Sequence, residues 1–312
     1  MPRVTQWGLR AVQPKSQAVQ PKMGRALPRH AGEPGSTPAY GRSRVETNPT
    51  GIPYHADGQK IRASVCLASY RGARYITEQL ESILTQLGPN DELVIVDDES
   101  PDDTVEQIKT FDDGRIRLIE ARLNQGYVKS FEQAVLAARG EYILLSDQDD
   151  VWLPGRLELI VDALQTSRVV ASNFDVLGDG ARPNIPRLRH EDSRRHAANI
   201  FGILVGYRAY YGCAMGFRRD VVPLFAPVPR YLVESHDLWL AICGNLAGSI
   251  RHLDESTLLR RIHDDNATPR SWRSLSAIVR ARIMLLRCLA VAWGRVRRSQ
   301  GSGSEEKAIA SR

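Results

Sequence analysis

Short apolar runs alternate with helical repeats along the chain from residue 61. Four of these runs have the length of buried strands: Ile61–Ala68, Leu93–Val96, Ile116–Ile119 and Tyr142–Leu145. The segments between them carry apolar residues three and four positions apart, the period of an amphipathic helix: Ile76, Leu80, Ile83, Leu84 and Leu87; Val105 and Ile108; Val128, Phe131 and Val135. This alternation predicts an α/β fold with a doubly wound, mostly parallel sheet and helices on both faces.

The chain divides by composition into a central domain and two ends. Residues 1–59 are rich in Pro, Gly, Gln, Ser and Arg without an apolar period, and we expect a disordered extension there. Residues 60–266 form the predicted domain, with one half to about residue 150 and a second half at 151–266. The second half is expected to hold a polar connection, an apolar stretch, a helix and a final strand pair, at 178–198, 211–217, 236–246 and up to Ile262.

The C-terminal segment predicts a basic amphipathic helix at 267–298, followed by a disordered tail at 299–312. Arginines fall on one side of this helix and apolar residues on much of the rest: Arg273, Arg280, Arg287, Arg295 and Arg298 against Leu275, Ile278, Ile283, Leu286, Leu289 and Trp293. Such a helix suits anionic lipid headgroups, so residues 272–298 are expected to contact the inner face of the cytoplasmic membrane. The alternative is a helix that packs on the protein's own core or on a second subunit.

The net charge of +6 comes from the two ends of the chain. Residues 1–60 carry 9 basic and 3 acidic groups, and residues 267–312 carry 10 and 2, which leaves 23 basic against 31 acidic groups in the centre. An acidic centre repels a polyphosphate backbone, so nucleic acid is not expected as a partner. A ligand that bears phosphate would need a metal cation there.

The cysteines and the lengths of the apolar runs indicate in which cellular compartment the protein is expected. The four cysteines form no CxxC pair and lie in apolar sequence, which is typical of buried thiols in a reducing environment. The N-terminus lacks the continuous apolar segment of a secretory signal, and no run of about 18 uncharged apolar residues occurs. We therefore expect a cytoplasmic protein without a membrane span.

Acidic clusters follow the second and the fourth predicted strands: Asp97, Asp98 and Glu99, and then Asp147, Asp149 and Asp150. Parallel strands bring their carboxyl ends to one edge of the sheet, so chemistry is expected there. Three acids within four residues repel one another, and a bound Mg²⁺ or Mn²⁺ relieves that repulsion. The alternatives are helix N-caps, at Ser100 or Asp102 for the first cluster and at Asp149 or Asp150 for the second.

Several short motifs occur together in order: Ser69-Tyr70-Arg71-Gly72, Val96-Asp97-Asp98-Glu99-Ser100, Asn124-Gln125-Gly126, Gly140-Glu141-Tyr142 and Ser146-Asp147-Gln148-Asp149-Asp150-Val151-Trp152. In this order and spacing the chain resembles glycosyltransferase family 2 of the GT-A fold, from about Ile61 to Asn266. The Asp-Gln-Asp-Asp-x-Trp form is most similar to the rhamnosyltransferase-like subgroup of bacterial surface-polysaccharide assembly. Arg71 departs from the family, in which Asn is common.

The resemblance implies an inverting, metal-dependent transfer of a sugar from dTDP-rhamnose or a UDP-sugar to a saccharide or a lipid-linked saccharide. By the same resemblance, the nucleotide-sugar is bound by Ser69, Tyr70, Asp97, Asp98, Asp147, Arg260 and Arg261. Asp149, the second acid of the family's DxD motif, would ligate Mg²⁺ or Mn²⁺. His263 would complete the metal shell.

Asp237 stands in the segment 234–239, where the resemblance implies the acid that activates the acceptor. A carboxylate within hydrogen-bond reach of a sugar hydroxyl can take its proton as the new bond forms. The structural alternative for Asp237 is an N-cap of the following helix. His236 is expected to be its structural partner and not a catalytic group.

Two other functions share these features. A catalytically inactive nucleotide-sugar-binding regulator would keep the pocket and lose the base, whereas Asp237 is present in its expected context. A nucleotidyltransferase also pairs aspartates on a doubly wound sheet, but such enzymes usually begin with a Gly-rich, basic phosphate loop. Residues 68–74 hold Gly72 as their one glycine.

Overall fold

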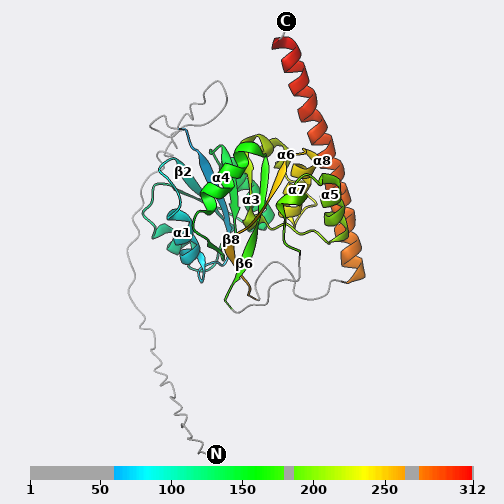
Figure 1. Ribbon diagram of the computed structural model, residues 1–312. Helices are drawn as coiled ribbons and strands as arrows, with labels where there is room; N and C mark the ends of the chain where they lie inside the picture. Colours follow the sequence, from blue (N-terminus) through cyan, green and yellow to red (C-terminus); the bar gives the residue numbers. More distant parts are fainter. Residues whose placement is uncertain (1–59, 179–185, 264–273, 311–312) are drawn as a thin grey trace, which may run out of the picture. The chain divides into compact units, whose positions relative to one another are not determined.

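A computed structural model describes residues 60–178, 186–263 and 274–310, with the backbone alone from 301 to 310 (Figure 1). The disorder expected at 1–59 lies outside these residues, as do Trp272 and Arg273 at the start of the expected C-terminal helix. The described part includes the predicted domain except for residues 179–185 and 264–266.

The described strands form one eight-stranded sheet in the order β3-β2-β1-β4-β7-β6-β8-β5. Strands β3, β2, β1 and β4 run parallel, β7 is antiparallel to both of its neighbours, and β8 is parallel to β6 and antiparallel to β5. The four strands predicted for the first half are confirmed, and the second half of the sheet is mixed. The bounds are β1 Ala63–Ser69, β2 Asp91–Asp97, β3 Ile116–Glu120, β4 Tyr142–Ser146, β5 Val151–Trp152, β6 Val169–Leu177, β7 Met215–Arg218 and β8 Ile250–Arg261.

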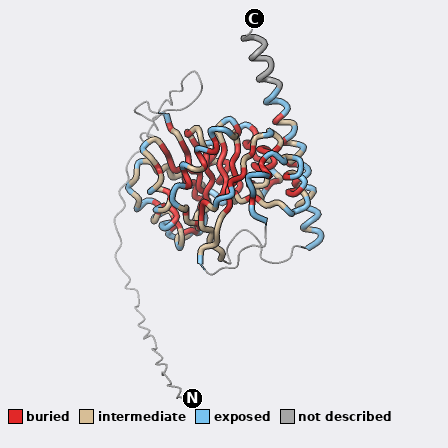
Figure 2. Tube along the Cα trace, in the orientation of Figure 1, coloured by how far each residue is buried: buried red, intermediate tan, exposed pale blue. Residues whose placement is uncertain are grey.

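Helices cover both faces of the sheet, as predicted. Alternate side chains of β1 enter two separate cores: Val65 and Leu67 pack with α1, α2 and α4, whereas Cys66 and Ala68 pack with α3 and α5 to α8. Figure 2 shows that the buried residues are concentrated in the central strands. The helices are α1 Ile76–Leu84, α2 Thr104–Lys109, α3 Tyr127–Ala137, α4 Arg156–Thr166, α5 His196–Val205, α6 Val222–Phe225, α7 His236–Leu246 and α8 Leu275–Ala310, with the short η1 His190–Asp192, η2 Gly212–Ala214 and η3 Arg219–Val221.

The strand pair expected near Ile262 is a single strand, β8. The exposed acids Asp254 and Glu255 lie within this strand, in an irregularity where the register between β6 and β8 shifts. The amide of Asn173 donates there to the carbonyls of Leu253 at 2.9 Å and Asp254 at 3.1 Å. These bonds satisfy the backbone that the shift leaves unpaired, so the strand continues through the polar pair.

Helix α8 packs one face on the domain, which was the alternative considered for this segment. It runs beside α5, α6 and α7 (Figure 1), and its buried residues Leu285, Cys288, Ala292 and Val296 join the core of that side. Arg295 was expected on the lipid side, but its guanidinium donates to the carbonyl of Leu224 at 2.8 Å.

The helical backbone of α8 continues to Ala310, beyond the end predicted at residue 298. Once a helix is nucleated, each further residue adds one hydrogen bond, so a Gly- and Ser-rich segment can extend it. Among the described residues, none of the helices combines the length and the hydropathy that a transmembrane span requires.

The fold leaves no space for a side chain at Gly140, so we expect Gly140→Ala to destabilise the protein. An added Cβ would lie 2.6 Å from the backbone of Ala63 and Ser64, at the amino-terminal end of β1. Overpacking of this kind costs about 1–3 kcal/mol, measured as the free energy of unfolding in urea. Gly114→Ala is the matched control because a Cβ there meets nothing within 4 Å. Equal stabilities of the two variants would contradict this account of Gly140.

Candidate active site

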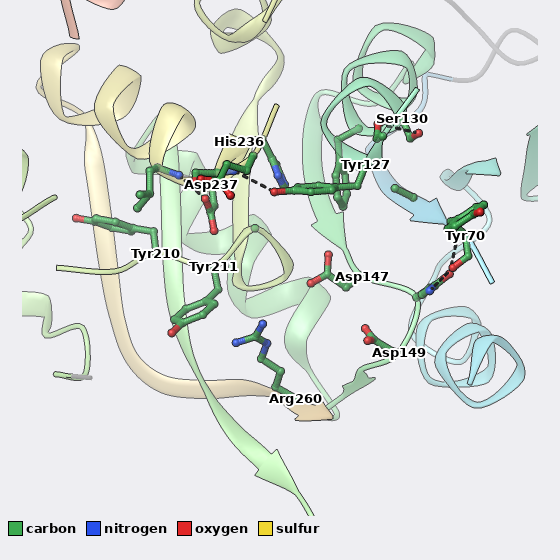
Figure 3. A pocket seen from close by; sticks show the side chains of 18 of the residues that line it. Tyr70, Tyr127, Ser130, Asp147, Asp149, Tyr210, Tyr211, His236, Asp237 and Arg260 are labelled. Carbon is green, nitrogen blue, oxygen red and sulfur yellow. Dashed lines mark hydrogen bonds between the residues drawn. The ribbon is translucent and has the colours of Figure 1, made fainter. Parts of the chain in front are cut away.

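A cavity of about 900 Å³ lies at the carboxyl ends of β1, β2 and β4 (Figure 3). One wall comes from the loops after these strands: Ser69, Tyr70, Asp98, Asp147 and Asp149. A second wall comes from the second half of the domain and from α8: Ile203, Tyr211, Asp237 and Arg282. Arg260 and His263 also line the cavity, and His263 lies against Asp149 of the first wall. A cavity of this size is in the range of small-molecule sites.

The loop after β1 is tied to the loop after β4. The N–H of Tyr70 donates to Oε1 of Gln148 at 2.8 Å, and Nε2 of Gln148 donates to the carbonyl of Tyr70 at 2.9 Å. A Cβ on Gly72 would lie 2.4 Å from that Oε1, so a glycine permits this close approach. Arg71 adopts φ +52°, a left-handed conformation that Asn reaches more easily. The chain therefore keeps the turn despite its departure from the family's Asn.

The two acids after β2 occupy different positions. Asp98 lines the cavity, and its carboxylate accepts the N–H groups of Gln125 at 2.9 Å and Gly126 at 2.8 Å. The buried carboxylate of Asp97 accepts from Oγ of Ser69 at 2.8 Å and from Oγ of Ser100 at 2.6 Å. Asp97 is not among the described residues that line the cavity. Of this pair, the structure brings Asp98 to the ligand side.

The acids after β4 form a crowded group. Asp147 and Asp149 line the cavity, while Asp150 is buried. The pKa of Asp147 is raised to about 6, first by burial and then by the negative charge of Asp149, and the positive charge of Arg260 opposes this rise. The pKa of Asp150 is raised well above its ordinary value by burial and by the charges of the other two acids. Burial and the neighbouring negative charges therefore disfavour the ionised forms of Asp147 and Asp150.

The end of β8 holds the acidic loop in place. Arg261 donates its backbone N–H to Oδ1 of Asp150 and its Nε to the carbonyl of Asp149, both at 3.1 Å. Its guanidinium also pairs with Glu78. Arg260 instead lines the cavity, with its guanidinium 4.6 Å from the ring centroid of Tyr211. Of the two arginines expected to contact the nucleotide-sugar, Arg260 faces the cavity and Arg261 supports the loop.

The oxygen donors around Asp149 fit a divalent cation. Nε2 of His263 lies 2.7 Å from Oδ2 of Asp149, so the two expected metal ligands are adjacent. Asp147, Asp150 and Cys213 also offer ligand atoms within 4.8 Å of one another. Burial raises the pKa of the Cys213 thiol, and hard cations prefer oxygen, so this thiol is a poor ligand for Mg²⁺ or Mn²⁺. A cation at the carboxylates would relieve the repulsion that raises the pKa of Asp147.

Asp237 lies in the first turn of α7, across the cavity from Asp147 (Figure 3). Its Oδ1 accepts the N–H of Leu238 at 2.7 Å. Burial raises the pKa of Asp237 to about 7, although this hydrogen bond and Arg260 favour the ionised form. The N-cap position belongs to Ser235, so Asp237 does not occupy the capping position considered as its alternative. A carboxyl group that titrates near neutral pH suits general-base catalysis.

His236 packs its ring among neighbours from other elements and was expected as a structural partner of Asp237. Its ring stacks on Phe131, with centroids 4.3 Å apart, and lies so close to Gly212 that a Cβ there would be 2.5 Å from Nε2. Burial lowers the pKa of His236 to about 3, so the ring is neutral. Its packing fixes the start of α7 and with it the neighbouring Asp237.

Two tyrosines of the cavity were not predicted from the sequence. The hydroxyl of Tyr127 accepts the N–H of Ser235 at 3.1 Å and so joins α3 to the start of α7. Its place directly after the Asn124-Gln125-Gly126 motif was the available signal. Tyr211 holds its ring beside Arg260, and it lies in an apolar stretch that gave no sign of this contact.

Comparisons with known proteins agree with this geometry. A family profile described as Glycosyl transferase family 2 matches residues 64–224. An uncharacterized glycosyltransferase of Nostoc sp. is 30% identical over 216 residues, which is 66% of each chain. The Escherichia coli protein named UDP-Glc:alpha-D-GlcNAc-diphosphoundecaprenol beta-1,3-glucosyltransferase WfgD is 27% identical over 120 residues, or 38% of this chain and 47% of its own. The chain thus spans between about half and two thirds of the length of these relatives.

Solved structures share the GT-A-like fold. TarS of S. aureus in complex with UDP-GlcNAc superposes with a TM-score of 0.54 at 19% identity, covering 75% of this chain and 72% of TarS. Glucosyl-3-phosphoglycerate synthase of Mycobacterium tuberculosis, in complex with Mn²⁺, UDP and glucosyl-3-phosphoglycerate, gives a TM-score of 0.50 at 16% identity, covering 75% and 80%. The profile covers about half of the chain, including the strand ends with Tyr70, Asp98 and Asp147. The chain therefore belongs to glycosyl transferase family 2.

Proposed function

We propose that the protein is an inverting, metal-dependent glycosyltransferase that moves a sugar from a nucleoside-diphosphate sugar to a hydroxyl acceptor. One observation carries this proposal: a single cavity holds Asp237, whose pKa is about 7, opposite Asp147, Asp149 and Arg260. The carboxyl group on one side suits an acceptor hydroxyl, and the charged groups on the other suit a diphosphate.

Asp237 acts on the acceptor. Its ionised carboxylate takes the hydroxyl proton while the hydroxyl oxygen bonds to the anomeric carbon of the donor sugar. The bond from that carbon to the diphosphate oxygen breaks, and the nucleoside diphosphate leaves with the electron pair. This single in-line displacement inverts the configuration at the anomeric carbon and needs no covalent intermediate.

The opposite wall acts on the leaving group. Arg260, whose guanidinium lies over Tyr211, offers positive charge to the diphosphate as negative charge develops on it. Asp149 and His263, with Asp147, are the residues that would hold Mg²⁺ or Mn²⁺, which when bound neutralises part of the diphosphate charge. The mycobacterial neighbour was solved with Mn²⁺ and UDP, which supports a divalent cation as the partner of the diphosphate.

The nucleoside is assigned to the loops after β1 and β2. Tyr70 offers a ring that is 38% exposed, and the Asp98 carboxylate reaches the cavity wall. Ser69 and Asp97 are hydrogen-bonded to each other, and support the two loops at the edge of the sheet. Arg261 contributes through the loop that it holds.

Two donors have support. The sequence form of residues 147–152 supports dTDP-rhamnose through its similarity to the rhamnosyltransferase-like subgroup. The nucleotides in the complexes of TarS and of the mycobacterial synthase support a UDP-sugar. A panel of donors separates these two.

The acceptor is a saccharide or a lipid-linked saccharide of bacterial surface polysaccharide or glycolipid assembly. The name of the relative WfgD, which includes a sugar on diphosphoundecaprenol, supports the lipid-linked class. This acceptor would place the protein in the cytoplasm, at the inner face of the cytoplasmic membrane.

Transfer assays with UDP- and dTDP-sugars test the proposal. We expect one donor class to be consumed, with NMR of the product showing the anomeric configuration opposite to that of the donor. Retention of configuration would contradict a single displacement. Donor binding in a thermal-shift assay without hydrolysis or transfer would instead favour the regulator considered from the sequence.

A further inference from the structure

Exposed apolar side chains are concentrated on two neighbouring helices. Nine of the thirteen large apolar residues exposed in the described chain belong to α5, the turn after it, or α8: Phe201, Val205, Tyr207, Leu275, Ile278, Val279, Ile283, Leu286 and Trp293. Single exposed apolar residues are common, but a contiguous group marks an interaction site.

Helix α8 carries two apolar stripes. One stripe is buried on the domain and contains Leu285, Cys288, Ala292 and Val296. At 100° per residue, a second stripe falls within an arc of roughly 80° on the other side, and contains Leu275, Val279, Ile283, Leu286 and Trp293. Figure 2 shows the first turns of α8 as largely exposed. The fold therefore uses one stripe and leaves the other at the surface.

The exposed groups of α5 and α8 meet at Arg282. A Cβ on Gly206 would lie 2.3 Å from a guanidinium nitrogen of Arg282, so the end of α5 touches α8 there. Val205 and Tyr207 stand on either side of Gly206, and Val279, Ile283 and Leu286 lie within about one turn of Arg282. We call the joint surface the apolar face: Phe201, Val205, Tyr207, Leu275, Val279, Ile283 and Leu286.

The charged residues of α8 beside the apolar face are all positive. From Leu275 to Gln300, α8 contains six arginines and no acidic residue. Arg295 is used by the fold, whereas Arg280 is exposed and Arg282 lies at the border of the apolar face. Apolar side chains bordered by arginines complement an anionic bilayer, in which acyl chains lie beneath the headgroups. A second copy offers a poorer match, because a two-fold contact would bring the arginines of both α8 helices together.

We propose that the apolar face docks on an anionic lipid bilayer as a peripheral membrane contact. Ile203 and Gly206 of the α5 region and Arg282 of α8 also line the cavity, so docking brings the second wall of the cavity close to the lipid surface. Delivery of a lipid-linked acceptor from that surface rests on the proposed function, whereas docking does not.

Vesicle co-sedimentation of the full chain tests the docking. We expect the protein to pellet with phosphatidylcholine vesicles that contain phosphatidylglycerol, and to be released from them by high salt. The double substitution Ile283→Asp and Leu286→Asp should lower the bound fraction about tenfold or more, because it removes two apolar side chains from the contact. Leu136→Asp on α3 is the matched control, since Leu136 is 60% exposed and lies outside the apolar face. Circular dichroism and thermal melting confirm folding of each variant.

Three results would overturn the proposal. They are equal pelleting of the double variant and the wild type, equal binding to vesicles without anionic lipid, and a dimer in size-exclusion chromatography that the double substitution dissociates. In transfer assays the double variant should keep its activity on a soluble acceptor and lose activity on an acceptor presented in vesicles. A protein that pellets as expected but transfers no sugar would keep the docking and reject the proposed function.

Discussion

Asp237→Asn is expected to lower turnover by about 100-fold or more while donor binding is retained, because the amide cannot accept the hydroxyl proton. The substitution keeps the size of the side chain and an oxygen for the N–H of Leu238. Steady-state transfer assays give the turnover, and titration with donor in a thermal-shift assay gives the binding. Asp103→Asn is the matched control, since Asp103 is an exposed carboxylate outside the cavity wall.

The same residue predicts a pH dependence. Burial raises the pKa of Asp237 to about 7, so the carboxyl group is protonated and inactive as a base at lower pH. Activity at saturating metal should therefore rise as pH increases through about 7, and Asp237→Asn should lose this step in its residual activity. Normal turnover of the variant, or an unchanged pH profile, would place the base on another residue.

Stability gives a check that is independent of activity. Because the pKa of Asp237 is raised by folding, its neutral form stabilises the fold at low pH, and this contribution is lost as pH rises through about 7. Above pH 7 the wild type must keep a buried charge that Asn does not have. The variant should thus melt at or above the wild-type temperature at pH 8, which separates lost chemistry from lost folding.

The parallel part of the sheet was predictable from the sequence because its signals are local. Each of the first four strands is a short apolar run, and each helix between them repeats apolar residues at 3.6 per turn. The helix α7 was placed at its observed bounds for the same reason. The strand pair predicted near Ile262 was wrong, because the contact that lets β8 continue through Asp254 comes from the amide of Asn173, which is distant in the sequence.

The site was predictable as a set of strand ends, but the direction of each side chain was not. Asp97 and Asp98 are adjacent acids after one strand, yet Ser69 and Ser100 hold the first while the second reaches the cavity. Arg260 faces the cavity and Arg261 supports the acidic loop, because neighbouring residues on a strand point to opposite faces of the sheet. The hydrogen bonds and contacts that orient these side chains join segments far apart in the chain. The spacing of motifs along the sequence therefore does not predict them.

Helix α8 shows how an amphipathic pattern can be ambiguous. The sequence divided it into an arginine side and an apolar side, but the apolar residues belong to two stripes with different neighbours. Cys288 and Ala292 are small and were not counted as apolar contacts, although they lie at the centre of the packed stripe. The choice between packing on the core and facing a membrane was therefore not exclusive, because different faces of one helix can do both.

Asp149→Ala is expected to abolish both the response to metal and most of the turnover. A cation at this site would stabilise the leaving diphosphate by several kcal/mol, so its loss would correspond to a decrease of about 100-fold or more. The carboxylate of Asp149 lines the cavity and lies against His263, whereas the loop is held through Asp150 and the backbone carbonyl of residue 149. Removing the side chain should therefore leave the fold intact.

The metal itself is tested on the wild-type chain. Chelation should abolish transfer, and Mn²⁺ or Mg²⁺ should restore it, whereas Asp149→Ala should respond to neither treatment. Calorimetric titration with Mn²⁺ in the presence of UDP or dTDP gives a readout that does not depend on turnover, and the variant should show weaker binding there. Asp103→Ala serves as the control for the loss of an exposed carboxylate. Full activity of the wild type in excess chelator would remove the cation from the reaction. The charge on the diphosphate would then be met by arginines that line the cavity, Arg260 among them.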